Sequence, residues 1–191
     1  MIPFHDDVVL GPMPPNALAE TGTNSSQKAF ADHLAGETMG SGARKGFTYR
    51  WILNHLQDAH VRVVPRSLLN LIALSAKHAL REGPKATGSQ LLHPLELAGA
   101  LEETSELRVA ELQEEHVVVR RMEALRNAKV MMAQKEVIRL LDAGHGDGAA
   151  VFDELVNLGV LAIRPDTRVD VPDLYRHGYG VKRSGGVARP K

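Results

Sequence analysis

The sequence predicts a mainly α-helical protein, in which a small helical bundle is followed by a winged-helix domain with a short β-hairpin wing. Apolar residues recur at helical spacing through most of residues 25–127. Glycines stand where the predicted helices end, at Gly36, Gly83 and Gly159. After residue 128 the predicted order becomes strand, helix, tight turn, helix and hairpin, which is the order of a winged helix.

The composition excludes several classes of protein. Lysine plus arginine equals aspartate plus glutamate at 23 each, so no overall field attracts nucleic acid or anionic lipid. Zero cysteines exclude disulfides, thiol catalysis and cysteine-bound zinc. The longest apolar run, residues 68–76, is far shorter than the ~20 residues of a membrane span. The start "MIPFHDD" lacks the basic and apolar parts of a signal peptide. We therefore expect a cytoplasmic protein with no membrane contact and no cofactor.

The chain divides into four predicted parts. Residues 1–24 carry four prolines and little periodicity, which predicts an irregular N-terminal arm. Residues 25–127 form the helical bundle, and residues 128–175 form the winged-helix domain. Residues 176–191 hold five basic residues, four glycines and no acid, which predicts a basic, glycine-containing tail.

Each helix of the bundle has its own boundary signal, from a capping hydroxyl, a first-turn proline or a closing glycine. These signals are Ser25 or Ser26 and Gly36 for the first helix, Thr48 for the second, Pro65 and Gly83 for the third, and Pro94 for the fourth. The apolar face is expected to hold Ala29, Phe30, His33 and Leu34 in the first helix, and Leu68, Leu69, Ile72, Ala76 and Leu80 in the third. The fourth helix, residues 94–115, has seven acids and one base and presents a solvated acidic face.

The stretch "MGSGARKGFTYRW", residues 39–51, combines glycines with basic residues and invites comparison with a phosphate-binding loop. A P-loop needs G-x-x-x-x-G-K-[ST], so that backbone N–H groups curl around the phosphates. Here Lys45 follows Arg44 rather than a glycine, and no apolar strand precedes the segment. We interpret it as the flexible entry to the helix that Thr48 begins, with Arg44 and Lys45 exposed.

DNA binding by the winged helix is weakly supported. Its second helix, "AAVFDELVNLG", carries Asp153 and Glu154 and no basic residue, although a groove-reading helix usually presents basic or amide side chains. The wing alternates arginines with Asp166 and Asp170. The cations left as candidates for nucleic acid or a protein partner are Arg164, Arg168, Arg176, Lys182, Arg183, Arg189 and Lys191.

No constellation for catalysis or metal binding stands out. The chain has no G-x-S-x-G elbow, and its nearest trio of possible metal ligands, His55, Asp58 and His60, lacks the spacing of a helical zinc pair. Arg66 follows Pro65 at the start of the third helix, where the first-turn amides favour an anion. From its position alone, a solvated arginine is the favoured interpretation.

Several stretches resemble a known family. "VPRSLLNLIALSAKHALREG" resembles a helix of the lid in AAA+ or STAND-type ATPases that begins with a sensor arginine. "MGSGARKGFTYRWILNHLQDA", "ETSELRVAELQEEH" and "RVDVPDLYRHGYGVKRSGGV" resemble the C-terminal region of large bacterial P-loop ATPases, where a winged helix follows the lid. The resemblance spans most of residues 30–187 and implies Arg66 as a nucleotide-sensing residue. This chain has no Walker A loop or Walker B pair, so that role requires an ATPase core from elsewhere.

The sequence leaves three hypotheses of function. In the first, the chain is not an enzyme but a regulatory, protein-interaction module that couples a P-loop ATPase core to a partner. In the second, it is a DNA-binding accessory protein that uses the wing and the basic tail. An ATP-hydrolysing enzyme with an unrecognised site is the third and least supported possibility.

Overall fold

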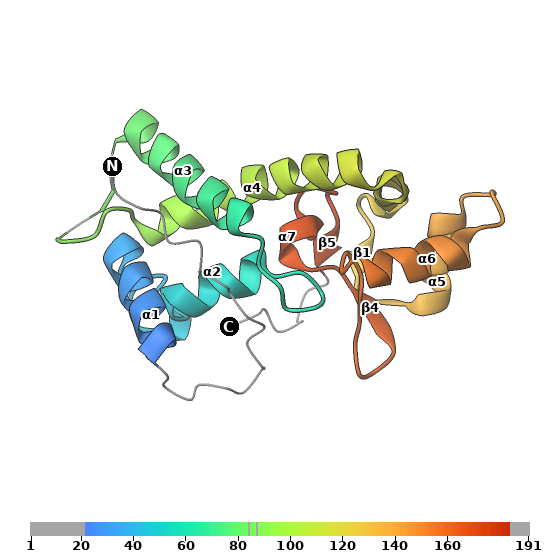
Figure 1. Cartoon of the computed structure of the whole chain (residues 1–191), viewed down its shortest axis with the longest axis horizontal. Coiled ribbons are helices and arrows are strands. Elements are labelled where there is room, and N and C mark those ends of the chain that lie inside the picture. Colours follow the sequence, from blue (N-terminus) through green and yellow to red (C-terminus); the bar gives the residue numbers. More distant parts are fainter. Residues whose placement is uncertain (1–21, 84, 87, 184–191) are drawn as a thin grey trace.

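The structure is a computed structural model that describes residues 22–83, 85–86 and 88–183. It is mainly helical with a few short strands, which confirms the predicted mainly α class. Figure 1 shows an N-terminal group of helices and a C-terminal group, with the long helix α4 running across both. Within the described residues, no helix has both the length and the apolar character to cross a membrane.

The N-terminal bundle is built from four helices, which pack in sequence so that α1 lies on α2, α2 on α3 and α3 on α4. As predicted, α3 begins at Pro65 and ends before Gly83, whose φ of +85° favours glycine. His93 starts α4 with a capping box, because its backbone N–H donates to Glu96 and its ring accepts from the Leu95 N–H. The bounds are α1 Gly22–Ala35, α2 Thr48–Leu56, α3 Pro65–Glu82 and α4 Pro94–Glu115.

Two predicted helix starts are wrong. Helix α1 begins at Gly22 rather than after Ser25 or Ser26, because no helix-breaking residue separates those serines from Gly22. Thr48 is the first residue of α2 rather than its cap, because the extended residue Phe47, with φ −80° and ψ 135°, occupies the cap position. Thr48 Oγ1 is buried without a hydrogen-bond partner, so it caps nothing.

The buried face of α3 also differs from the predicted one. The residues that the structure buries are Ser67, Leu71, Leu74, Ser75 and Ala79. Small side chains at three of these positions let neighbouring helices approach closely, and the Ser75 hydroxyl is satisfied by the Leu71 carbonyl at 2.6 Å. Leu69 and Leu80, predicted in the core, are 65% and 87% exposed. Helix α1 shows the same shift, since Phe30 is 54% exposed and His33 is exposed, while Leu34 is buried.

The C-terminal group contains a three-stranded antiparallel sheet in the order β2-β4-β3. Along the chain, the helices α5 and α6 lie between strands β2 and β3, and β4 follows β3. In register, Met132 faces Val169 and Ala162 faces Asp170. Helices α5 and α6 pack so closely that a Cβ added to Gly148 would lie only 2.5 Å from the Ile138 carbonyl oxygen. The bounds are 3₁₀-helix η2 Val117–Leu125, β2 Met132–Ala133, α5 Gln134–Asp142, α6 Gly148–Asn157, β3 Ala162–Ile163 and β4 Arg168–Asp170.

Residues after β4 return to the middle of the molecule and join its two ends. Helix α7, Asp173–Arg176, packs against α4, and strand β5, Lys182–Arg183, pairs in parallel with β1, Lys129–Val130. Ser105 on α4 donates to the Leu174 carbonyl at 2.5 Å and accepts from the Gly178 N–H at 2.8 Å. Residues 176–183, predicted as the start of the tail, are therefore part of the folded body, and Tyr179 is fully buried.

Candidate functional site

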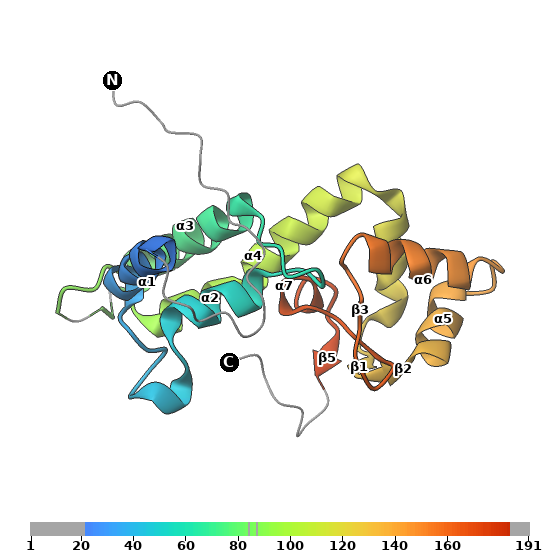
Figure 2. The same cartoon turned by 60° about the horizontal axis from the view of Figure 1, so that its bottom comes forward.

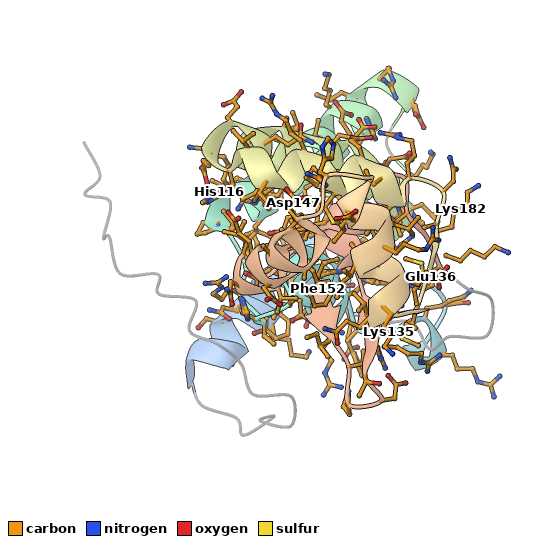
Figure 3. All side chains as sticks on the ribbon, turned by 90° about the vertical axis from the view of Figure 1, so that its right-hand side faces the viewer. His116, Lys135, Glu136, Asp147, Phe152 and Lys182 are labelled. Carbon is orange, nitrogen blue, oxygen red and sulfur yellow. The ribbon has the colours of Figure 1, made fainter. Side chains whose placement is uncertain are left out.

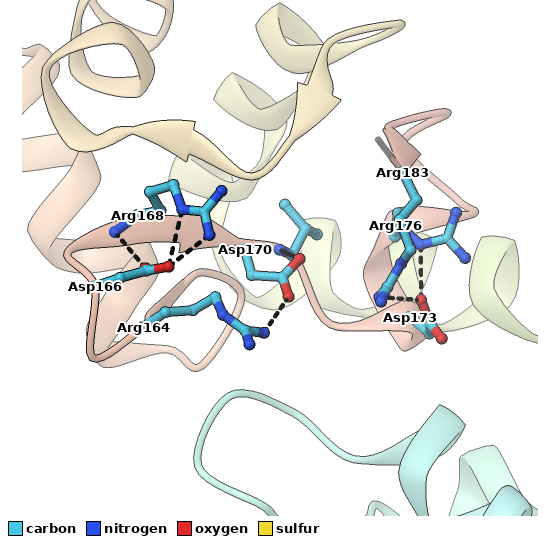
Figure 4. Close-up of polar contacts among 8 residues, drawn as sticks. Arg164, Asp166, Arg168, Asp170, Asp173, Arg176 and Arg183 are labelled. Atoms are coloured by element: carbon cyan, nitrogen blue, oxygen red, sulfur yellow. Dashed lines mark hydrogen bonds and ion pairs between the residues drawn. The ribbon is translucent and has the colours of Figure 1, made fainter. Parts of the chain in front are cut away.

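The hairpin of β3 and β4, predicted as the wing, has two arginines that form ion pairs with the aspartates alternating with them. Arg164 Nη1 lies 3.2 Å from Asp170 Oδ2, and Arg168 Nη2 lies 2.6 Å from Asp166 Oδ2 (Figure 4). All four residues belong to the hairpin of β3 and β4 and its turn, so the pairs form locally. Within this hairpin the aspartates therefore offset the positive potential that would attract a phosphate backbone.

Asp173 is the centre of a buried charged cluster. Its Oδ1 accepts from Arg176 Nε at 2.7 Å and from Arg183 Nη2 at 3.0 Å (Figure 4). Its Oδ2 lies 3.4 Å from His55 Nε2. Burial alone raises the pKa of the Asp173 carboxyl, but the hydrogen bond from Arg176 and the charges of Arg176 and Arg183 outweigh it and lower that pKa overall. The cluster holds α2, α7 and β5 together.

Two histidines beside this cluster are held uncharged. Burial lowers the pKa of His55, whose Nδ1 donates to the Trp51 carbonyl at 2.8 Å and whose ring stacks on Trp51. Burial, followed by the charge of Arg176, lowers the pKa of His177, and the Arg176 Nη2 lies 2.8 Å from His177 Nε2. Protonating either ring adds positive charge to a cluster that already has two arginines and one carboxylate.

Arg176 and Arg183, predicted from the sequence as cations for nucleic acid or a protein partner, instead pair with Asp173. Asp173 was not predicted as a site residue, and His55 was considered only within a metal-ligand trio. The spacing of Asp173 and Arg176 at i and i+3 on one helix was a usable signal for their ion pair. Nothing in the sequence signals that His55 meets Asp173, because the two are brought together only by the packing of α2 against α7.

Arg66 lies on the surface at the start of α3. Its side chain is 71% exposed, and its Nη1 lies 3.6 Å from Glu111 Oε1 on α4. An exposed pair at this distance contributes little to stability, so Arg66 is free to change partner.

An apolar stripe runs along the outer face of α3. Its exposed residues follow an i, i+4, i+11 spacing along one helix face, and two of them are the exposed leucines described above. We call this set the α3 stripe: Leu69, Ala73 and Leu80. Ala76, which lies between them in the sequence, is half-buried and packs against the core. The stripe starts one turn after Arg66, so a partner that covers it would also lie close to that guanidinium.

The outer face of α6 is acidic. Asp153 and Glu154 are exposed, whereas Phe152 and Leu155 are buried. Figure 3 looks onto this end of the molecule, where Lys135 and Glu136 of the neighbouring helix α5 are labelled, and both are exposed. Helix α6 has no lysine or arginine to offer a phosphate group.

The remaining candidate residues do not gather into one site. Lys182 is exposed and stands in register with Lys129, whereas Arg189 and Lys191 lie outside the described residues. Asp58, from the trio considered for a metal, instead accepts from the backbone N–H of His60 and from Arg62. Among the described residues, no three potential metal-ligating side chains come together.

Comparison with known proteins finds no matching family model, no matching curated protein and no matching solved structure.

Proposed function

We propose that the chain is a non-catalytic regulatory module whose lid-like helical bundle and winged-helix domain dock on a P-loop ATPase core carried by another chain. The α3 stripe is the observation that carries this proposal. Leu69 and Leu80 expose most of their side chains on a helix that has buried a different face against its neighbours. Apolar groups gathered on one face of a helix are typical of a surface that a partner covers.

Arg66 supports an ATPase as the partner. A guanidinium that reads a nucleotide must reach phosphates held by another structure, and Arg66 is exposed and weakly paired with Glu111. Docking through the α3 stripe would bring Arg66 to the edge of the interface. In this arrangement Arg66 senses nucleotide only when the core is bound, and the ATPase core supplies the catalytic residues.

The C-terminal group supports the winged-helix half of the proposal. A strand, two helices and a hairpin follow one another along the chain, and the three strands pair in one antiparallel sheet in the order β2-β4-β3. A winged helix has this arrangement. Its second helix presents Asp153 and Glu154, which suit a basic protein surface better than a DNA groove. We therefore assign this half to protein contact.

Site-specific photo-cross-linking tests the proposal. A photoreactive phenylalanine analogue replaces Leu69 in the full chain, and the cross-linked protein is identified by mass spectrometry after irradiation of the cells that produce it. We expect a P-loop ATPase from Leu69 and no such product from a matched position on α6, Asp153. Failure to recover a P-loop ATPase at Leu69, or equal recovery at both positions, contradicts the proposal.

The alternative, a DNA-binding accessory protein, depends on Arg164, Arg168 and the basic residues after them. The wing arginines already pair with aspartates, so this alternative relies mainly on the end of the chain. Electrophoretic shift assays with duplex DNA at two salt concentrations separate the hypotheses. Binding at ~50 mM salt that weakens steeply at ~200 mM and disappears when Arg189 and Lys191 are replaced by alanine favours the alternative.

A further inference from the structure

The segment between α1 and α2 forms a projecting loop. Thr38 and Phe47 form an antiparallel bridge at its base, where the Met39 N–H also donates to the Gly46 carbonyl at 2.9 Å. The short 3₁₀-helix η1, Ala43–Lys45, forms its tip, and Figure 2 shows it standing away from the body of the bundle. We call residues 38–50, the loop and the first residues of α2, the basic finger.

The positive charge of the basic finger is not offset by acids. Arg44 and Lys45 are exposed, and neither forms an ion pair with any residue that the structure describes. Residues 38–57 contain no aspartate or glutamate, and Glu37 at the base is 3.8 Å from Lys28. This is the opposite of the wing, where each arginine lies against an aspartate.

An aromatic ring lies beside these cations. Phe47 is 36% exposed, and the guanidinium carbon of Arg50 lies 5.9 Å from the centre of its ring. Cations that track phosphates, together with an aromatic face on which a base can stack, are the two components of sequence-independent binding to single strands. An acidic protein surface would pair with the cations but would not need an aromatic ring on which to stack.

We propose that the basic finger binds single-stranded nucleic acid through Arg44, Lys45 and Arg50 on the phosphates and Phe47 on a base. A duplex keeps its bases stacked on one another, and α6 offers no basic residue to its groove, so a single strand fits better. The binding is additional to docking on an ATPase and uses a different surface from the α3 stripe.

Fluorescence anisotropy with a labelled 20-nucleotide oligo-dT and the full chain tests this inference. Three phosphate contacts with a slope of about −0.7 each predict that binding weakens about 20-fold between ~50 and ~200 mM salt. We expect Arg44→Ala combined with Lys45→Ala to weaken binding at least about tenfold at ~50 mM salt. The matched control, Arg164→Ala combined with Arg168→Ala on the wing, removes the same number of cations and should leave the affinity within about twofold.

The role of the ring is tested with Phe47→Leu and two further probes. We expect this variant to bind oligo-dT several-fold more weakly, and the wild type to prefer oligo-dT over a duplex of the same length and over labelled poly-glutamate. Unfolding curves check that each variant is folded. The inference is overturned by no oligo-dT binding at ~50 mM salt, by an equal or larger loss from the wing variant, or by poly-glutamate binding as tight as that of oligo-dT. It is also overturned if Arg189→Ala with Lys191→Ala abolishes binding while the finger variant does not.

Discussion

The C-terminal group pairs its arginines with acidic side chains, whereas the N-terminal bundle leaves apolar and basic side chains exposed. Arg164 and Arg168 pair with aspartates of their own hairpin, and Arg176 and Arg183 converge on the buried Asp173. In the bundle, by contrast, the α3 stripe is exposed and the cations of the basic finger have no acidic partner among the described residues. Groups that already satisfy one another hold a fold together, whereas unsatisfied apolar and charged groups are available to partners.

We therefore expect partner contacts on the N-terminal bundle rather than on the C-terminal group. The number of cations in the C-terminal part of the sequence suggests a nucleic-acid surface there, yet most of that charge is offset within the fold.

Asp173→Asn should be the most damaging of these changes. It leaves Arg176 and Arg183, whose side chains are largely buried, without their carboxylate, and breaking a buried ion pair in this way costs about 3–5 kcal/mol. Urea denaturation of the variant measures the loss. The matched control is Asp166→Asn on the exposed wing, which should leave the midpoint unchanged; equal effects of the two substitutions would remove the contrast between them.

Leu155→Ala should lower the free energy of unfolding by about 2–5 kcal/mol, because Leu155 is fully buried on α6 and its loss leaves a cavity. Leu80→Ala on the α3 stripe removes the same atoms from an exposed site and should cost within about 0.5 kcal/mol. Chemical denaturation compares the two variants. A large loss at Leu80 would mean that the stripe is covered within the isolated chain.

Stability should fall as the pH drops below the ordinary histidine pKa of about 6.5. The pKa values of His55 and His177 are lowered in the folded protein, so the unfolded chain binds more protons in this range and gains stability relative to the fold. Asp173, whose pKa is also lowered, adds a loss at more acidic pH as it becomes protonated. Thermal unfolding from pH 8 to pH 4 measures the profile, and the variant with His55→Gln and His177→Gln should lose the step that begins near pH 6.5. If the double variant keeps this step, other histidines cause the loss of stability.

Arg66→Ala should have the smallest effect on the isolated chain, within about 0.5 kcal/mol, because Arg66 is mostly exposed and its contact with Glu111 is long. Differential scanning calorimetry is sufficient to test this. A loss of several kcal/mol would identify Arg66 as a structural residue and would remove its proposed role at an ATPase.

The sequence predicts the boundaries of α3 better than its buried face. Pro65 and Gly83 define α3 because their backbone preferences act locally. The buried face was missed because α3 carries leucines on two sides, and the neighbouring helices pack on the side where Ser67, Ser75 and Ala79 permit close approach. Which side is covered depends on residues far away in the sequence.

The charged cluster was beyond prediction for the same reason. Asp173 and Arg176 are near in sequence, but His55 and Arg183 reach them only after α2 and β5 have packed. In the wing the alternation of arginine and aspartate was visible, and the structure shows that it produces ion pairs.

The central claim, that the α3 stripe docks on an ATPase core, is tested most directly by the ATP turnover of the P-loop ATPase recovered by cross-linking. Turnover is measured while the purified chain is titrated in, either as wild type or with Leu69→Asp and Leu80→Asp, after unfolding curves have shown that both are folded. We predict that the wild type changes turnover in a saturable way and that the stripe variant does not. Turnover that is unaffected by the wild type, or changed equally by both proteins, would contradict the claim.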